Sequence, residues 1–259
     1  MTRSRFVFSP RPQTLAALAV LLGGAGCGKA TDQPVVSIHR QQLDQVLAAY
    51  GTPEARAAVH SYRMTGTLHA TMRQADVKTV RTFARPDSLR VEIAYPDHAE
   101  IRIVADTVGW GATPTGDIVP VQGALLSSMV LQAARADLPW LLEKRGADAV
   151  PVEPMEVDGQ SLPGFELKLG GGRSMRIFLD PTTNLISRAQ TLLVSGSMHT
   201  VFETVYSDFR DVNGVKFPFH EESTAGGMPT GATDFESVEV NPPADPARFG
   251  PGAPAPKSS

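Results

Sequence analysis

The side chains of this sequence that could bind a metal ion are spread along the chain rather than grouped. The chain contains six histidines: His39, His60, His69, His98, His199 and His220. No two of them stand three or four residues apart, the spacing that places two imidazoles on one helix face for a metal ion. His69 and His199 fall in predicted strands, where histidines commonly face solvent. We therefore predict no metal site and no cofactor.

Carboxylates and nucleophiles also fail to form a catalytic pattern. Glu221 and Glu222 are adjacent, but neighbours on a strand point to opposite faces, so we expect a solvated strand end there. The chain has no G-x-S-x-G nucleophile motif. The pair Gly109-x-Gly111 is followed by Pro114, where a dinucleotide-binding motif has its third glycine. The sequence therefore predicts a protein that is not an enzyme.

The composition is that of a folded domain. The 259 residues are 42% hydrophobic and carry a formal net charge of −3. This apolar content is too high for a wholly disordered chain. The slightly acidic balance argues against non-specific binding to nucleic acid, which depends on clustered positive charge. A single cysteine excludes an internal disulfide framework.

The first segment, residues 1–26, has the pattern of a secretory signal peptide. It contains three arginines and no acidic residue, then an apolar run over 15–22, then small residues. The run is far shorter than the ~20 apolar residues of a spanning helix. We predict that this segment is removed and that the mature protein has no membrane-spanning helix.

The lone cysteine, Cys27, follows this segment directly. The residues Gly24-Ala25-Gly26-Cys27 resemble a bacterial lipobox, although Gly24 stands where that motif prefers leucine. The resemblance implies a lipidated Cys27 at the mature N-terminus, and two or more acyl chains anchor a protein stably. Gly28, rather than aspartate, follows and implies the outer membrane. The alternative is cleavage after Ala30, which removes Cys27 and leaves a soluble periplasmic protein.

The N-terminal half of the mature chain begins with a polar spacer over 27–36. Ser37 is placed to cap a helix that ends at Gly51. From Ser61 the apolar residues alternate with polar ones, which predicts strands. These strands cover about 61–72, 77–84, 89–95, 101–103 and 108–110.

The second half begins with helical spacing of apolar residues over 123–145, interrupted at Asp137 and Pro139. Strands are predicted again after Pro154. They cover about 165–169, 175–179, 184–194, 198–210, 215–220 and 232–240. Asn213-Gly214 is a strong hairpin signal. The Pro/Gly-rich tail, 241–259, is expected to be largely disordered.

These elements predict one domain over 37–240, mainly β with helices (α+β). Short links favour an antiparallel sheet, and a meander this long must curl, which leaves the helices of 123–145 to cover its concave face. We interpret that cover as a lid over a hydrophobic cavity, with simple core packing as the alternative. The expected lining is Leu126, Met129, Val130, Trp140 and Leu141 from the lid, and Tyr62, Leu89, Val91, Ile93, Phe165 and Leu167 from the wall.

Several segments resemble one known family. They are the residues 61–67 (SYRMTGT), 83–90 (FARPDSLR), 180–186 (DPTTNLI), 206–218 (YSDFRDVNGVKFP) and 241–243 (NPP). These are similar to LolA/LolB-like outer-membrane lipoprotein carriers. The resemblance implies an incomplete antiparallel β-barrel of about eleven strands with a helical lid over an apolar cavity. It also implies a lid-holding arginine on an early strand, for which Arg63, Arg81 and Arg90 are the candidates.

The function implied by this resemblance is the binding and transfer, or reception, of lipoprotein acyl chains or another lipid in the bacterial cell envelope. A lipidated Cys27 favours the receptor-like role, whereas the strand motifs are closer to the soluble carriers. The alternative is an RseB-like envelope sensor or scaffold that binds a protein partner without carrying lipid. The expected partners are therefore a lipid or lipoprotein acyl chain, the membrane through Cys27, and another envelope protein, but no nucleic acid.

Overall fold

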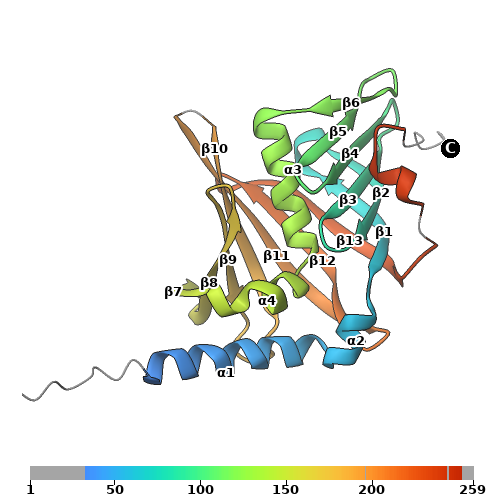
Figure 1. The fold of residues 1–259 in the computed structure, drawn as a ribbon. Helices are drawn as coiled ribbons and strands as arrows, with labels where there is room; N and C mark the ends of the chain where they lie inside the picture. The colour runs from blue at the N-terminus through green and yellow to red at the C-terminus, as the bar shows by residue number, and fades with distance from the viewer. Residues whose placement is uncertain (1–32, 196, 244, 253–259) are drawn as a thin grey trace, which may run out of the picture.

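The computed structural model describes residues 33–195, 197–243 and 245–252 (Figure 1). The predicted signal peptide, Cys27 and the last seven residues lie outside this range. No helix within it is both long and apolar enough to span a bilayer. The helices are α1 (Gln33–Tyr50), α2 (Pro53–Ala58), α3 (Gly123–Ala136) and α4 (Trp140–Arg145), with 3₁₀ turns η1 (Thr71–Arg73), η2 (Gly146–Asp148) and η3 (Pro246–Phe249).

The strands form one sheet. They are β1 (Ser61–Ala70), β2 (Ala75–Ala84), β3 (Ser88–Ala94), β4 (Ala99–Ala105), β5 (Val108–Ala112), β6 (Ile118–Val121), β7 (Val150–Val157), β8 (Gln160–Gly170), β9 (Arg173–Leu179), β10 (Ile186–Ser195), β11 (Met198–Val212), β12 (Val215–Ala225) and β13 (Met228–Val240). The order in the sheet is β6-β5-β4-β3-β2-β1-β13-β12-β11-β10-β9-β8-β7. Strands that are neighbours in this order pair in antiparallel fashion, and the pairing of β1 with β13 joins the two halves of the sheet.

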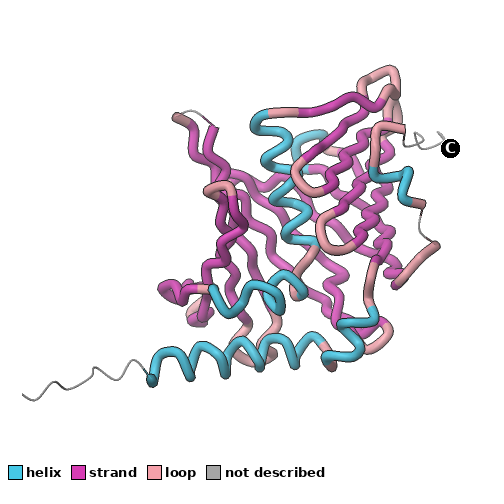
Figure 2. Tube along the Cα trace, viewed as in Figure 1, coloured by secondary structure: helices cyan, strands magenta, loops and turns pink. Residues whose placement is uncertain are grey.

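This sheet is an open half-barrel, as the sequence predicted. β6 and β7 are its two free edges, and the sheet curls around α3 without closing (Figures 1 and 2). The turn at Asn213-Gly214 is confirmed: both residues have positive φ, and Val212 pairs with Val215 across it.

The central pairing of β1 with β13 depends on a glycine. The register shifts between Thr65 and Gly66, and a Cβ on Gly66 would lie 2.1 Å from the carbonyl oxygen of Asp234. Only a residue without a side chain allows this close approach, so Gly66 lets the two halves of the sheet join at the bulge.

The two edge strands were not predicted. Pro120 lies in β6, and Pro151 and Pro154 lie in β7. Proline argues against a strand in a sequence, yet it is tolerated at a sheet edge, where one side of the strand needs no hydrogen bonds. The sheet therefore has 13 strands rather than the ten or eleven expected.

Both ends of the domain extend beyond the predicted limits. α1 begins at Gln33, within the predicted spacer and before the expected cap at Ser37. The tail was expected to be disordered, but η3 packs Phe249 against the outer face of β4. Arg248 also donates hydrogen bonds to Glu92. The physical reason is that Ile101 and Ile103 lie on the outer face of β4, and Phe249 shields them from water.

The interior divides into two packed clusters. One lies between α3 and the β1–β4 side of the sheet and includes Phe83, Val91 and Met129. The other lies between α1, α4 and the β8–β10 side and includes Leu142 and Ile177. α3 spans the opening between these two sides (Figure 1).

Candidate functional site

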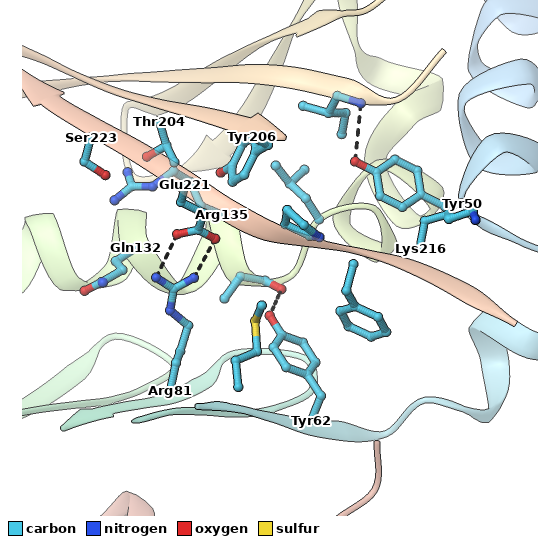
Figure 3. Close-up of a pocket in the computed structure, with 16 residues that line it drawn as sticks. Tyr50, Tyr62, Arg81, Gln132, Arg135, Thr204, Tyr206, Lys216, Glu221 and Ser223 are labelled. Carbon is cyan, nitrogen blue, oxygen red and sulfur yellow. Dashed lines mark hydrogen bonds and ion pairs between the residues drawn. The ribbon is translucent and has the colours of Figure 1, made fainter. Parts of the chain in front are cut away.

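A small cavity lies between α3 and the concave face of the sheet (Figure 3). Its floor comes from β1, β2, β11 and β12, and α3 covers it. The volume is about 70 Å³. One water molecule needs roughly 10–15 Å³ of such space, so in this closed arrangement the cavity has room for a few waters.

The polar part of the cavity is built around an ion pair between Arg81 of β2 and Glu221 of β12. The two terminal nitrogens of the guanidinium each donate to one carboxylate oxygen at 2.8 Å. The side chains are 16% and 8% exposed. Burial by itself lowers the pKa of Arg81, but the charge and hydrogen bonds of Glu221 outweigh it and raise that pKa above its ordinary value. The pair therefore holds the guanidinium in its charged form.

Strand alternation places both partners inside. Glu221 follows Phe217 and Phe219 at two-residue steps along β12, and all three are buried. Arg81 stands two residues from the buried Phe83 on β2. Because successive side chains on a strand alternate between faces, each charged residue takes a position that otherwise carries an apolar side chain.

The prediction that Glu221 and Glu222 point to opposite faces is confirmed, since Glu221 is buried and Glu222 is exposed. The prediction of a solvated strand end is wrong for Glu221. β12 continues to Ala225, beyond the expected end at His220, and carries this carboxylate into the interior.

A second cation, Arg135, reaches the cavity from α3. Its guanidinium donates to the hydroxyl of Thr191 at 3.2 Å. No carboxylate among the described residues forms an ion pair with it. Burial lowers the pKa of Arg135. Tyr206 and Glu221 raise that pKa, but less than burial lowers it, and the charge of Arg81 adds a small further lowering. Arg135 is therefore a half-buried cation whose hydrogen-bond acceptor is a neutral hydroxyl.

Tyr206 lies opposite Glu221 in the pairing of β11 with β12 and faces the same space (Figure 3). Its hydroxyl is buried and has no hydrogen-bond partner among the described residues, and the same is true of Nε of Arg81. Burial raises the pKa of Tyr206, so the hydroxyl keeps its proton. The cavity thus presents two unused N–H and O–H donors.

The charged residues that border the cavity are Arg81, Arg135, Lys216 and Glu221. Lys216 alternates with the inward-facing Phe217 and Glu221 on β12, so the cations on the inner face are Arg81 and Arg135. A groove of about 340 Å³ continues from the cavity along α3 toward Leu125 and Phe202. The cavity and the groove share Gln132, Arg135, Thr204 and Ser223. These shared polar side chains mark the junction between the deep cavity and its groove.

The base of the lid is fixed by side chains at the C-terminal end of α3. The hydroxyl of Tyr62 donates to the carbonyl of Ala136, and the indole N–H of Trp140 donates to the carbonyl of Arg56 at 2.9 Å. Trp140 also stacks on Tyr62 with ring centroids 6.1 Å apart. These contacts hold the chain where α3 ends and α4 begins.

Arg85, which was not among the candidates named from the sequence, is the arginine that lies beside Asp137 at the C-terminal end of α3. Its Nε lies 3.6 Å from the carboxylate of Asp137, which follows α3. Arg63 and Arg81 pair instead with Glu239 and Glu221, both on strands. The third candidate, Arg90, pairs with Glu92.

Asp137 is the other unusual group at this base. Its side chain is only 7% exposed, and burial raises its pKa to about 7, although the charge of Arg85 opposes this shift. The two groups are near one another but do not form a hydrogen bond.

The predicted lining residues lie mainly in the packed interior. Nine are buried: Tyr62, Leu89, Val91, Ile93, Met129, Trp140, Leu141, Phe165 and Leu167. Leu126 and Val130 are half-buried. Tyr62 lines the cavity, and Val130 and Leu141 border a separate pocket beside α3. With α3 in place, the others pack in the two core clusters.

The structure also shows residues that the sequence analysis missed, above all Arg135, Tyr206 and Glu221. The inward direction of Glu221 and Arg81 could have been predicted, because each occupies a strand position at a two-residue step from buried apolar residues. Tyr206 and Arg135 had no such signal. Among the described residues no group of three or more histidine, cysteine and acidic side chains is placed to hold a metal ion.

No family model and no curated protein matches this sequence. Solved structures do match its fold. A domain from Vibrio parahaemolyticus assigned to outer membrane lipoprotein sorting is 11% identical, with a TM-score of 0.53 over 82% of this chain and 97% of that one. A LolA superfamily protein from Nitrosomonas europaea is 12% identical, with a TM-score of 0.52 over 82% and 97%.

A DUF1329 family protein from Desulfovibrio piger is similar in the same way. It is 11% identical, with a TM-score of 0.51 over 82% of this chain and 96% of that one. At these identities the agreement concerns the path of the backbone. This chain has the open half-barrel fold of LolA superfamily and outer membrane lipoprotein-sorting domains.

Proposed function

We propose that this protein binds lipid or lipoprotein acyl chains in the bacterial cell envelope and passes them on or receives them. The observation that carries the proposal is the arrangement of α3, an amphipathic helix that lies inside the concave sheet over a cavity and a groove. The solved structures with this fold include domains assigned to lipoprotein sorting, which supports the same class of ligand.

The closed cavity is too small for a long acyl chain, so binding requires α3 to move. Ligand pockets commonly have volumes of about 300–1,000 Å³. The hydrogen bonds named above lie at the C-terminal end of α3: Tyr62 of β1 bonds Ala136, Arg135 bonds Thr191 of β10, and Trp140 bonds Arg56 of α2. We infer that α3 swings about its C-terminal end.

Such a movement would expose the apolar residues that α3 now covers. Val91 and Ile93 of β3 belong to the cluster between α3 and the sheet, and Met129 of α3 packs against them in it. An acyl chain would replace the contacts of α3 at this surface, with a gain of about 25 cal/mol per Å² of apolar area removed from water. This is how the sequence-predicted lining residues would come to hold ligand.

Attachment to a membrane is the second part of the proposal. A lipidated Cys27 would place the domain at the outer membrane, facing the periplasm. In Cys27→Ala the protein should lose its acyl groups and move from the membrane fraction to the soluble fraction. If the mature N-terminus begins after Ala30 instead, mass measurement of the intact protein will contradict the anchor.

The carrier function is tested on protein purified from membranes. Native mass spectrometry should detect bound lipid, and emptied protein should take up a fluorescent fatty acid. Hydrogen exchange in α3 should change when the lipid binds, while exchange in the β11–β12 hairpin should stay constant. Protein that is always empty and takes up no fatty acid would refute the proposal, and one stable cross-linked protein partner would then favour a sensor or scaffold.

A further inference from the structure

We infer that the junction between the cavity and the groove is a binding site for the anionic headgroup of a single-chain amphiphile, a carboxylate or a phosphate, held by Arg135 together with Arg81 and Tyr206. This inference rests on the proposed lipid-binding function and adds the charge of the ligand. It starts from the polar groups that the folded chain leaves unsatisfied in the cavity.

The first argument is the balance of charge. Two guanidinium groups, Arg81 and Arg135, meet one carboxylate at the cavity, and both oxygens of Glu221 already accept from Arg81. Arg135 has the neutral hydroxyl of Thr191 as its hydrogen-bond acceptor. A buried charge is costly unless it is paired. An anionic ligand would supply the missing charge.

The second argument is the supply of donors. The hydroxyl of Tyr206 and Nε of Arg81 are buried without partners, and both belong to residues that line the same cavity. Buried donors are nearly always satisfied in folded proteins. Arg135 lines both the cavity and the groove. Carboxylate and phosphate oxygens accept from guanidinium groups in charge-assisted, often bidentate, hydrogen bonds.

The third argument is the position of these groups between two apolar surfaces. On one side the cavity is lined by Tyr62, Met64 and Ile186, and on the other the groove passes Leu125 and Phe202. A headgroup at Arg135 therefore has an apolar path on either side for one acyl chain. A neutral lipid would leave Arg135 without an anionic partner.

The test compares three ligands with the same chain: dodecanoate, dodecyl phosphate and the neutral dodecanol. Binding to the full protein is measured by native mass spectrometry at equal submicellar concentrations. We expect both anions to bind about tenfold or more tightly than the alcohol. The ratio of the two anions then distinguishes a carboxylate from a phosphate headgroup.

Variants assign the effect to the site. Arg135→Gln should remove about tenfold or more of the affinity for the anions and leave the affinity for dodecanol unchanged. Arg135→Lys should restore part of it, and Tyr206→Phe should weaken anion binding without loss of stability. The control is Arg176→Gln, because Arg176 is exposed and paired with Glu166 on strands away from the cavity.

The outcomes separate this inference from the function on which it rests. Equal binding of dodecanol and the anions, or an Arg135→Gln protein that binds anions normally, would overturn the headgroup site and leave the lipid-binding function standing. If none of the three ligands binds, the lipid-binding function itself fails.

Discussion

The two faces of the central sheet treat charge in opposite ways. On the outer face Lys78 pairs with Glu236 at 2.5 Å, and His69 lies between Asp76 and Asp234 at 2.8 and 3.0 Å. On the inner face the carboxylate of Glu221 pairs with Arg81, and no carboxylate among the described residues pairs with Arg135. The outer charges are paired and exposed to water, whereas the inner face keeps one guanidinium without an anionic partner.

The comparison shows that charged side chains on the outer face cost little stability, whereas those on the inner face cost more. An exposed pair is worth about 0–1 kcal/mol, because water solvates each partner nearly as well. A buried charge without a partner costs several kcal/mol. A chain that keeps Arg135 without an anionic partner and the Tyr206 hydroxyl without a hydrogen bond loses stability there, which is typical of a ligand site.

The largest effect should come from the inner carboxylate. Glu221→Gln leaves Arg81 buried without its partner, and we expect a loss of about 3–5 kcal/mol in the free energy of unfolding. The matched outer change, Glu236→Gln, should cost far less, because water solvates both partners of that exposed pair. Urea unfolding of both variants measures the contrast, and equal losses would show that the two faces do not differ.

Asp137 at the lid base should give the next largest effect, through pH. A carboxyl whose folded pKa is raised to about 7 makes a contribution to stability that is fully present below about pH 4 and is lost as the pH rises to about 7. Asparagine does not ionise, so the stability of Asp137→Asn should not fall in this way as the pH rises. Relative to the parent, this variant should therefore gain about 3–4 kcal/mol in stability between pH 4 and pH 8. Thermal unfolding across this range tests it, and parallel curves would contradict the raised pKa.

The unsatisfied groups of the inner face should give a smaller gain. Tyr206→Phe removes a buried hydroxyl that has no partner. We expect no loss of stability and a gain of up to about 1 kcal/mol, because the cost of an unpaired polar group disappears. Urea unfolding in the absence of lipid is the measurement. A loss above about 1 kcal/mol would mean that the hydroxyl has a structural partner.

The smallest effect should come from the outer histidines. Hydrogen bonds to Asp76 and Asp234 raise the pKa of His69, and those to Asp234 and Glu222 raise the pKa of His220. Their contribution is present below about pH 6.5 and is lost as the pH rises through the raised values. Because both side chains are partly exposed, Asp234→Asn should reduce this pH dependence by less than about 1 kcal/mol. Proton NMR titration of the two imidazoles checks the direction of the shifts.

Much of the fold was predictable from local patterns. Alternation identified the strands from β1 to β5 and from β8 to β13, and helical spacing identified α3 and α4. The failures were β6, β7 and η3, which are held by pairing or packing with distant residues rather than by their own pattern. Pro120 and Pro154 show why: the cost of proline depends on whether the strand lies at an edge, and that is a property of the whole sheet.

The sequence by itself determined which residues face inward along each strand, because side-chain direction follows from a period of two. In principle it therefore placed Arg81 and Glu221 inside. The tertiary structure alone decided that they meet, across 140 positions of sequence, because β1 pairs with β13 and so brings β2 and β12 onto one concave wall. It also decided that α3 lies over them and adds Arg135 without a carboxylate. Local periodicity depends on neighbouring residues, whereas the balance of charge in a cavity depends on which distant segments enclose it.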